Sequence, residues 1–190
     1  MIQRPLFTTL PPDSWCHWFA GLTDGEGHFQ IWIGRQTGRP KLQMGVRFKL
    51  QLREDDKAIL EEIRDYLSIG SLNKYNHSRQ RSRGSYTMDS IDFKVTRINQ
   101  IMHTLIPLFD KFPLRTKKQE DYHIWREAAK LVSTKQHMTY LGRMKYLDLY
   151  IALIETRNKQ RAKYGWKPLN NARRVRILEL MQADSILLRH

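Results

Sequence analysis

The spacing of apolar side chains changes from a helical to a strand-like period near residue 25. An i, i+3, i+4, i+7 pattern runs from Trp15 to Leu22 and predicts a helix over about 14–24. Phe29, Ile31 and Ile33 then alternate with other side chains, which indicates a half-buried strand. A chain that passes in this way from helix to strand is expected to pack the helix on the apolar face of a sheet.

The same two periods recur further along the chain. Residues 43–52 alternate again, and REDDKAILEEIRDYLSIG, with acids in its first turn and a glycine at its end, predicts a helix. SLNKY and YTMDSIDFKV predict two further strands, and RINQIMHTLIPLF predicts a helix. The fold class is therefore α+β, in which helices cover one face of a four-stranded antiparallel sheet and leave the other face open to solvent.

The open face of this sheet carries side chains that suit contacts with base edges and phosphates. They are Gln30, Trp32, Gln43, Arg47, Lys49, Gln51, Asn73, Tyr75, Asp92 and Lys94. Polar residues point outward on any half-buried sheet, so a single position decides nothing. Residues 28–53 contain six Lys or Arg and no acid, however, which favours DNA binding for the set. Arg35 in the first turn, and Arg81 and Arg83 in a basic loop, are further predicted DNA contacts.

The charge balance restricts the class of partner. The chain has 33 Lys and Arg against 19 Asp and Glu, a net charge of +14, which points to nucleic acid more than to an anionic membrane or to solubility alone. Its single cysteine excludes an intramolecular disulfide, and its histidines lack metal-binding spacing. No apolar run is long enough for a membrane span. We expect a soluble intracellular protein, and both an organelle and a prokaryotic cytoplasm fit.

The junction of the first helix and strand reads FAGLTDGEG, from Phe19 to Gly27. It resembles the LAGLIDADG motif of homing endonucleases, with Glu26 in place of the second aspartate. The segments FKLQLREDDKAILEEI and PLRTKKQEDYHIW resemble later parts of that family in the same order, so the similarity covers about residues 14–125. The resemblance implies the αββαββα fold and cleavage of double-stranded DNA.

Roles follow from the resemblance position by position. Glu26 matches the metal-ligating acid, and the backbone carbonyl of Gly25 is its usual companion ligand. The implied cofactor is Mg2+, and Mn2+ or Ca2+ could occupy the same site, because carboxylates and carbonyls suit hard cations. Lys117 matches the basic residue of the catalytic pocket, with Lys118 as its close rival. A catalytic glutamine is assigned to Gln51, although Leu52 occupies that position in strict register.

The motif occurs only once in the chain, so a complete site would need two chains. A homodimer packed about a twofold axis would bring two copies of Glu26 together. The resemblance assigns the dimer interface to Phe19, Ala20, Gly21, Asp24 and Gly25, where small residues would let two helices approach closely and Asp24 would brace the helix pair.

The predicted function is that of a homodimeric homing endonuclease. It would cleave a long pseudo-palindromic DNA site to leave 3′ overhangs, and so promote intron mobility. An RNA maturase that assists intron splicing and binds RNA, or a DNA-binding regulator that has lost cleavage, are alternatives with the same fold.

Three regions are expected: an N-terminal arm (1–13), the endonuclease core (14–135) and a helical extension of the same domain (136–190). In the extension, Met144, Leu147, Tyr150, Ile151 and Ile154 share one side of a predicted helix.

Overall fold

The computed structural model describes residues 10–34, 43–78 and 88–168, and the chain divides into two compact units. The first unit contains the residues up to Gln30 together with Arg47–Gln119. The second contains Ile31–Val46 together with the residues from Glu120 onward. Within the described ranges, none of the helices has a stretch long and apolar enough to cross a lipid bilayer.

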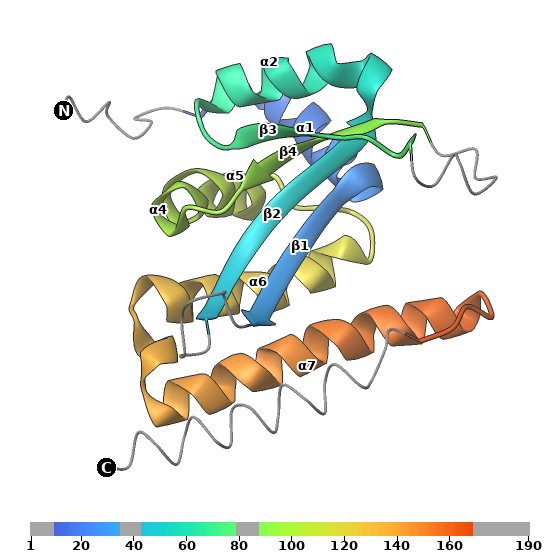
Figure 1. Cartoon of the computed structure of the whole chain (residues 1–190). Helices are drawn as coiled ribbons and strands as arrows, with labels where there is room; N and C mark the ends of the chain where they lie inside the picture. Colours follow the sequence, from blue (N-terminus) through green and yellow to red (C-terminus); the bar gives the residue numbers. More distant parts are fainter. Residues whose placement is uncertain (1–9, 35–42, 79–87, 169–190) are drawn as a thin grey trace. The chain divides into compact units, whose positions relative to one another are not determined.

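The helices and strands follow the predicted order. Helix α1 (Asp13–Glu26) ends directly before β1 (Gly27–Gly34), and β2 (Gln43–Arg53) leads through a short 3-10 turn into α2 (Lys57–Leu67) (Figure 1). Strands β3 (Ser71–Tyr75) and β4 (Ser90–Val95) come next, followed by α4 (Ile98–Gln100), a π-helical turn (Ile101–Leu105) and α5 (Ile106–Lys111). The four strands form one sheet in the order β1-β2-β4-β3. The predicted α+β fold is confirmed.

The register of the sheet separates an apolar face from a polar face. Strand β4 is antiparallel to both β2 and β3, and Leu50 and Leu72 both lie opposite Phe93. One position along, Gln51 and Asn73 both lie opposite Asp92. Because neighbouring residues of a strand point to opposite faces, the Phe93 row belongs to the core and the Asp92 row to the other side of the sheet.

Aromatic rings join α1 and α5 to the apolar face. Phe19 of α1 stacks on Phe109 of α5 with ring centroids 5.6 Å apart, and it meets Phe48 of β2 edge-on at 6.2 Å. All three side chains are fully buried. Since burial of such a side chain contributes roughly 1.5–3 kcal/mol, this cluster fixes α1 on the sheet and so fixes the place of its last turn.

Pro107 explains the π-helical turn. It lacks an N–H, and its ring crowds the carbonyl four residues earlier, which belongs to His103 in the π-helical segment. The helix predicted over RINQIMHTLIPLF therefore forms, but with a local change in its hydrogen bonding.

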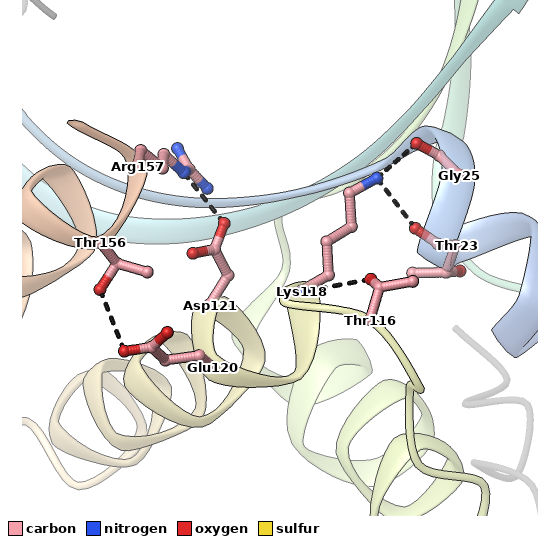
Figure 2. Close-up of polar contacts among 8 residues, drawn as sticks. All are labelled: Thr23, Gly25, Thr116, Lys118, Glu120, Asp121, Thr156 and Arg157. Carbon is pink, nitrogen blue, oxygen red and sulfur yellow. Dashed lines mark hydrogen bonds and ion pairs between the residues drawn. The ribbon is translucent and has the colours of Figure 1, made fainter. Parts of the chain in front are cut away.

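The second unit contains most of α6 (Lys118–Ser133), α7 (Tyr140–Lys163) and the adjoining ends of β1 and β2. The buried hydroxyl of Tyr146 donates to the backbone carbonyls of Gly45 (2.7 Å) and Trp32 (3.3 Å), so α7 holds these strand ends together. An ion pair of 3.0 Å between Arg157 and Asp121 joins α7 to α6 (Figure 2).

The predicted apolar side of the C-terminal helix is partly wrong. Met144 is 42 % exposed, whereas Tyr146, Leu147 and Leu153 are the buried apolar residues of α7. The helix is rotated from its predicted setting because the Tyr146 hydroxyl finds its acceptors on β1 and β2. Residues 169–190 of the predicted extension lie outside the described residues.

Candidate active site and nucleic-acid interface

The last turn of α1 concentrates negative charge. Asp24 and Glu26 lie in this turn, which contains no basic residue, and the carboxyl end of a helix adds its own partial negative charge. Glu26 is exposed, and Gly27 follows it at the start of β1. A Cβ on Gly27 would lie 2.6 Å from the Thr23 carbonyl oxygen. Only glycine therefore lets the strand leave the helix this closely.

Asp24 binds a loop of its own chain. Its carboxylate accepts hydrogen bonds from the backbone N–H of Arg115 (2.7 Å) and Thr116 (3.1 Å) and from the Thr116 hydroxyl (2.7 Å). The Thr116 hydroxyl oxygen in turn accepts from the backbone N–H of Lys118, the first residue of α6. Asp24 thus fixes where α6 begins relative to α1, through contacts that lie within one chain.

Lys118 reaches back from this loop to α1. Its ammonium donates to the carbonyl oxygens of Gly25 (2.5 Å) and Thr23 (3.2 Å), as Figure 2 shows. The resemblance assigned the pocket lysine to Lys117, with Lys118 as its rival. The structure brings Lys118 to the motif, because the Asp24 and Thr116 contacts set the start of α6.

Glu26 and the Gly25 carbonyl offer oxygen ligands, the type that Mg2+, Mn2+ and Ca2+ prefer. Both lie at the exposed end of α1, so this donor set fits such an ion. Among the residues that the structure describes, no group of three or more His, Cys, Asp or Glu side chains could hold a metal within one chain.

One face of α1 is open along its small residues. Among the residues that the structure describes, and apart from the backbone of α1 itself, no atom lies within 4 Å of a Cβ added to Gly21 or Gly25. A cavity of about 380 Å3 opens on the same helix, lined by His17, Ala20, Gly21, Asp24, Pro113 and Arg115.

Phe19 and Trp18 of α1 differ in burial from what the sequence predicts. Phe19 was predicted at the dimer interface, which is wrong because its side chain is fully buried in the core. The helical period from Trp15 to Leu22 places Trp18 on the same apolar side as Trp15, yet Trp18 is 42 % exposed. Its spacing of three residues from Gly21 is the signal that could have placed it on the open helix face. Ala20 is 5 % exposed and borders the cavity.

The polar face of the sheet contains a connected network. The Lys49 ammonium lies 3.2 Å from the Asp92 carboxylate and donates to the Gln51 side-chain oxygen at 3.0 Å. The Gln51 amide nitrogen donates to the Ser90 hydroxyl at 2.7 Å, and a ring nitrogen of His77 lies 2.9 Å from the same hydroxyl. Sequence reasoning missed Ser90 and His77, which carry no motif.

Asp92 departs from the expectation that it faces solvent. Its side chain is fully buried, so it does not present a surface for base contacts; it holds Lys49 in place instead. Burial and, second, the negative charge of Asp92 raise the pKa of the Tyr75 hydroxyl. Tyr75 itself is 40 % exposed beside the network.

The other predicted DNA contacts are half-buried or lie outside the described residues. Gln51 is on the polar face, whereas Leu52 lies opposite Ile91 on the apolar face. The half-buried positions are Gln30, Trp32, Gln43, Arg47, Asn73 and Lys94. The Trp32 indole also covers Gly45, where a Cβ would lie 2.8 Å from its ring nitrogen. Arg35, Arg81 and Arg83 lie outside the described residues.

The chain matches a known family over the motif and over the loop of Arg115 and Thr116. Residues 19–129 match the sequence model of the family described as LAGLIDADG endonuclease. A probable intron-encoded endonuclease 3 of Neurospora crassa is 32 % identical over 137 residues, which are 71 % of this chain and 23 % of that protein. The chain thus spans about a quarter of the length of such relatives.

Solved structures share the fold. The homing endonuclease I-TnaI superposes with a TM-score of 0.67 at 21 % identity, over 87 % of this chain and 97 % of its own. I-SmaMI bound to an uncleaved DNA target in the presence of calcium ions superposes with a TM-score of 0.65 at 20 % identity, over 82 % of this chain and 50 % of its own.

Proposed function

Since this chain belongs to the LAGLIDADG endonuclease family, we propose that it is a homing endonuclease that cleaves both strands of a DNA site by metal-dependent hydrolysis. The observation that carries the proposal is the contact of the Lys118 ammonium with the Gly25 carbonyl in the last turn of α1, which also contains Glu26. These groups offer metal ligands and a cation at one point, from which β1 leads directly into the sheet.

Glu26 and the Gly25 carbonyl would hold a divalent cation, for which we propose Mg2+. Such an ion supplies charge neutralisation at the phosphate and lowers the pKa of a bound water. The solved I-SmaMI complex with calcium ions supports a site for hard cations in this fold. Asp24 holds the loop that carries Lys118, and Lys118 keeps a positive charge beside the reacting phosphate.

The polar face of the sheet is the proposed DNA surface. Lys49, held by Asp92 and Gln51, contributes a fixed positive charge, and Asn73, Tyr75 and Lys94 lie on the same face. A paired β-ribbon fits the major groove of B-DNA, where such side chains reach base edges and phosphates. The I-SmaMI complex with DNA supports double-stranded DNA as the partner.

A homodimer would complete the site. The chain has one motif, and it aligns with nearly all of I-TnaI but with half of I-SmaMI, as a chain with one unit would align with a chain that holds two. The open helix face at Trp18, Gly21 and Gly25 offers the packing surface. We propose that two copies of Glu26 meet there above a pseudo-palindromic site, and that cleavage leaves 3′ overhangs and promotes intron mobility.

The proposal is tested with DNA that joins the two exons flanking the intron that encodes the chain. The wild type is incubated with this DNA and Mg2+ beside Glu26→Gln and the control Glu61→Gln, which makes the same chemical change on the surface of α2. We expect the wild type and the control to cut both strands, and Glu26→Gln to bind DNA without cutting. A wild type that binds and never nicks would instead fit a regulator without cleavage, and equal cutting by Glu26→Gln would reject the assigned site.

A further inference from the structure

We infer that the Lys118 ammonium occupies the motif when no metal is bound, and that a divalent metal must displace this ammonium from the Gly25 carbonyl. This inference rests on the proposed metal site at Glu26 and Gly25. It concerns the state of that site before metal arrives, and it gives Lys118 a role in metal binding in addition to its place beside the phosphate.

Geometry makes the ammonium and the metal competitors. The Lys118 Nζ lies 2.5 Å from the Gly25 carbonyl oxygen, and divalent cations bind such oxygens at about 2.0–2.6 Å. Two cations on one oxygen would lie within roughly 5 Å of each other, where like charges repel strongly. The second bond, to the Thr23 carbonyl at 3.2 Å, shows that the ammonium is seated against the end of α1.

The charge of α1 explains why a lysine occupies this place. The last turn of α1 contains two acids and no basic residue. Without a cation from another element, the two carboxylates would repel each other and would also repel the phosphate of DNA. Lys118 supplies one positive charge from another element. It therefore stabilises the metal-free chain at the cost of weaker metal binding.

Asp24 is a positioning residue in this arrangement. It fixes the backbone of Arg115 and Thr116, and the Thr116 hydroxyl accepts from the Lys118 N–H. The backbone of Lys118 is thus held while its four-carbon side chain can turn. The ammonium can leave Gly25 when a metal binds and still remain close to the site.

The first test measures Mn2+ affinity of the full chain by the EPR signal of the free ion. We expect Lys118→Met to bind Mn2+ about tenfold more tightly than the wild type, because the competing charge is gone. Lys111→Met is the matched control: it removes the same charge beside Asp13, at the other end of α1, and should change the affinity less than about twofold. Circular dichroism verifies that each variant is folded.

Glu26→Gln separates this inference from the proposed function. If Glu26→Gln binds Mn2+ as well as the wild type, the metal site itself is rejected. If Glu26→Gln loses Mn2+ while Lys118→Met matches the wild type, only the displacement is rejected. A tighter affinity in Lys117→Met, in place of Lys118→Met, would also overturn it, because Lys117 would then be the competing cation.

A second measurement follows the ammonium directly. A short pulse of acetylating reagent, read by mass spectrometry, should label Lys118 more with saturating Mg2+ than without metal, and Glu26→Gln should abolish this increase. Unchanged or decreased labelling of Lys118 on addition of Mg2+ to the wild type would contradict displacement.

Discussion

The hydroxyl of Thr116 donates a 2.7 Å hydrogen bond to the carboxylate of Asp24, although the two residues are 92 positions apart in the chain. Together with two backbone N–H groups, it gives the first acid of the motif three donors from one loop. Asp24 and Glu26 are thus separated in role by geometry: one carboxylate points into its own chain and holds a loop, and the other is exposed.

Replacement of Asp24 by Asn should destabilise the chain. An amide has one acceptor oxygen in place of two, and its NH2 would face the loop donors. We expect a loss of about 1–3 kcal/mol in the free energy of unfolding, measured with urea. Asp65→Asn, on the exposed surface of α2, is the control and should change it by less than about 0.5 kcal/mol. Equal effects of the two variants would show that Asp24 does not stabilise the chain by holding the loop of Arg115 and Thr116.

Replacement of Gly21 by Ala should separate folding from dimerisation. A Cβ at this position meets no atom within 4 Å in the described part of the chain beyond the backbone of α1, so the helix should gain stability, by about 0.5–1 kcal/mol. The same methyl group would obstruct close packing of a second α1. We therefore expect a weaker dimer in sedimentation equilibrium. A dimer of unchanged strength would show that this helix face is not the interface.

Gly27→Ala, in contrast to Gly21→Ala, should lower the stability of the chain. Its Cβ would lie 2.6 Å from the Thr23 carbonyl oxygen, so either α1 or β1 has to move. Such overpacking costs typically about 1–3 kcal/mol, which thermal unfolding of the variant would reveal. Stability equal to that of the wild type would mean that the junction of α1 and β1 is looser than the structure indicates.

Asp92→Asn should lower the pKa of the Tyr75 hydroxyl. Burial is the main cause that raises this pKa, and the negative charge of Asp92 adds to it by opposing tyrosinate formation. Removal of the charge leaves the first cause in place, so the pKa should fall only part of the way to its ordinary value. NMR titration of 13C-labelled tyrosine measures it, with Tyr75→Phe to assign the signal. An unchanged pKa would mean that Asp92 does not act on Tyr75.

The contribution of Tyr146 to stability should vanish at high pH. Burial raises the pKa of its hydroxyl above the ordinary value near 10. The folded state therefore keeps the proton while the unfolded state loses it. The stabilisation is complete below about pH 10 and declines by up to about 1.4 kcal/mol per pH unit above it.

Tyr146→Phe provides the measurement. At pH 8 the variant should cost about 1–2 kcal/mol of unfolding free energy, because two carbonyls lose their donor. The difference between wild type and variant should shrink between pH 10 and 11. A constant difference across this range would contradict a protonated hydroxyl in the folded state.

Much of the fold could be predicted from local patterns. Helix α1 and the strand after it follow from the change of period between Leu22 and Phe29, and that change depends only on side-chain direction in helices and strands. The two faces of the sheet follow from alternation, which places Gln51 on the polar side and Leu52 on the apolar side. These features are set by residues that are neighbours in the sequence.

Other features depended on contacts between distant residues. The alternation could not show that Asp92 is buried under Lys49, because their pairing joins two strands. Helical spacing placed Phe19 and Trp18 on the same apolar side of α1. Only the position of Phe109 decided that the Phe19 ring is buried in the core and that Trp18 is not. The face of α7 was set by carbonyl groups on β1 and β2.

The sequence by itself determined the order of helices and strands, the polar face of the sheet and the motif with its acids at the end of α1. The tertiary structure alone decided that Lys118 meets the Gly25 carbonyl and that Asp24 holds its loop. The physical reason is the separation, along the sequence, of the residues that interact. Period and charge are carried by adjacent side chains, whereas a hydrogen bond between residues more than 90 positions apart exists only after the core has brought the two segments together.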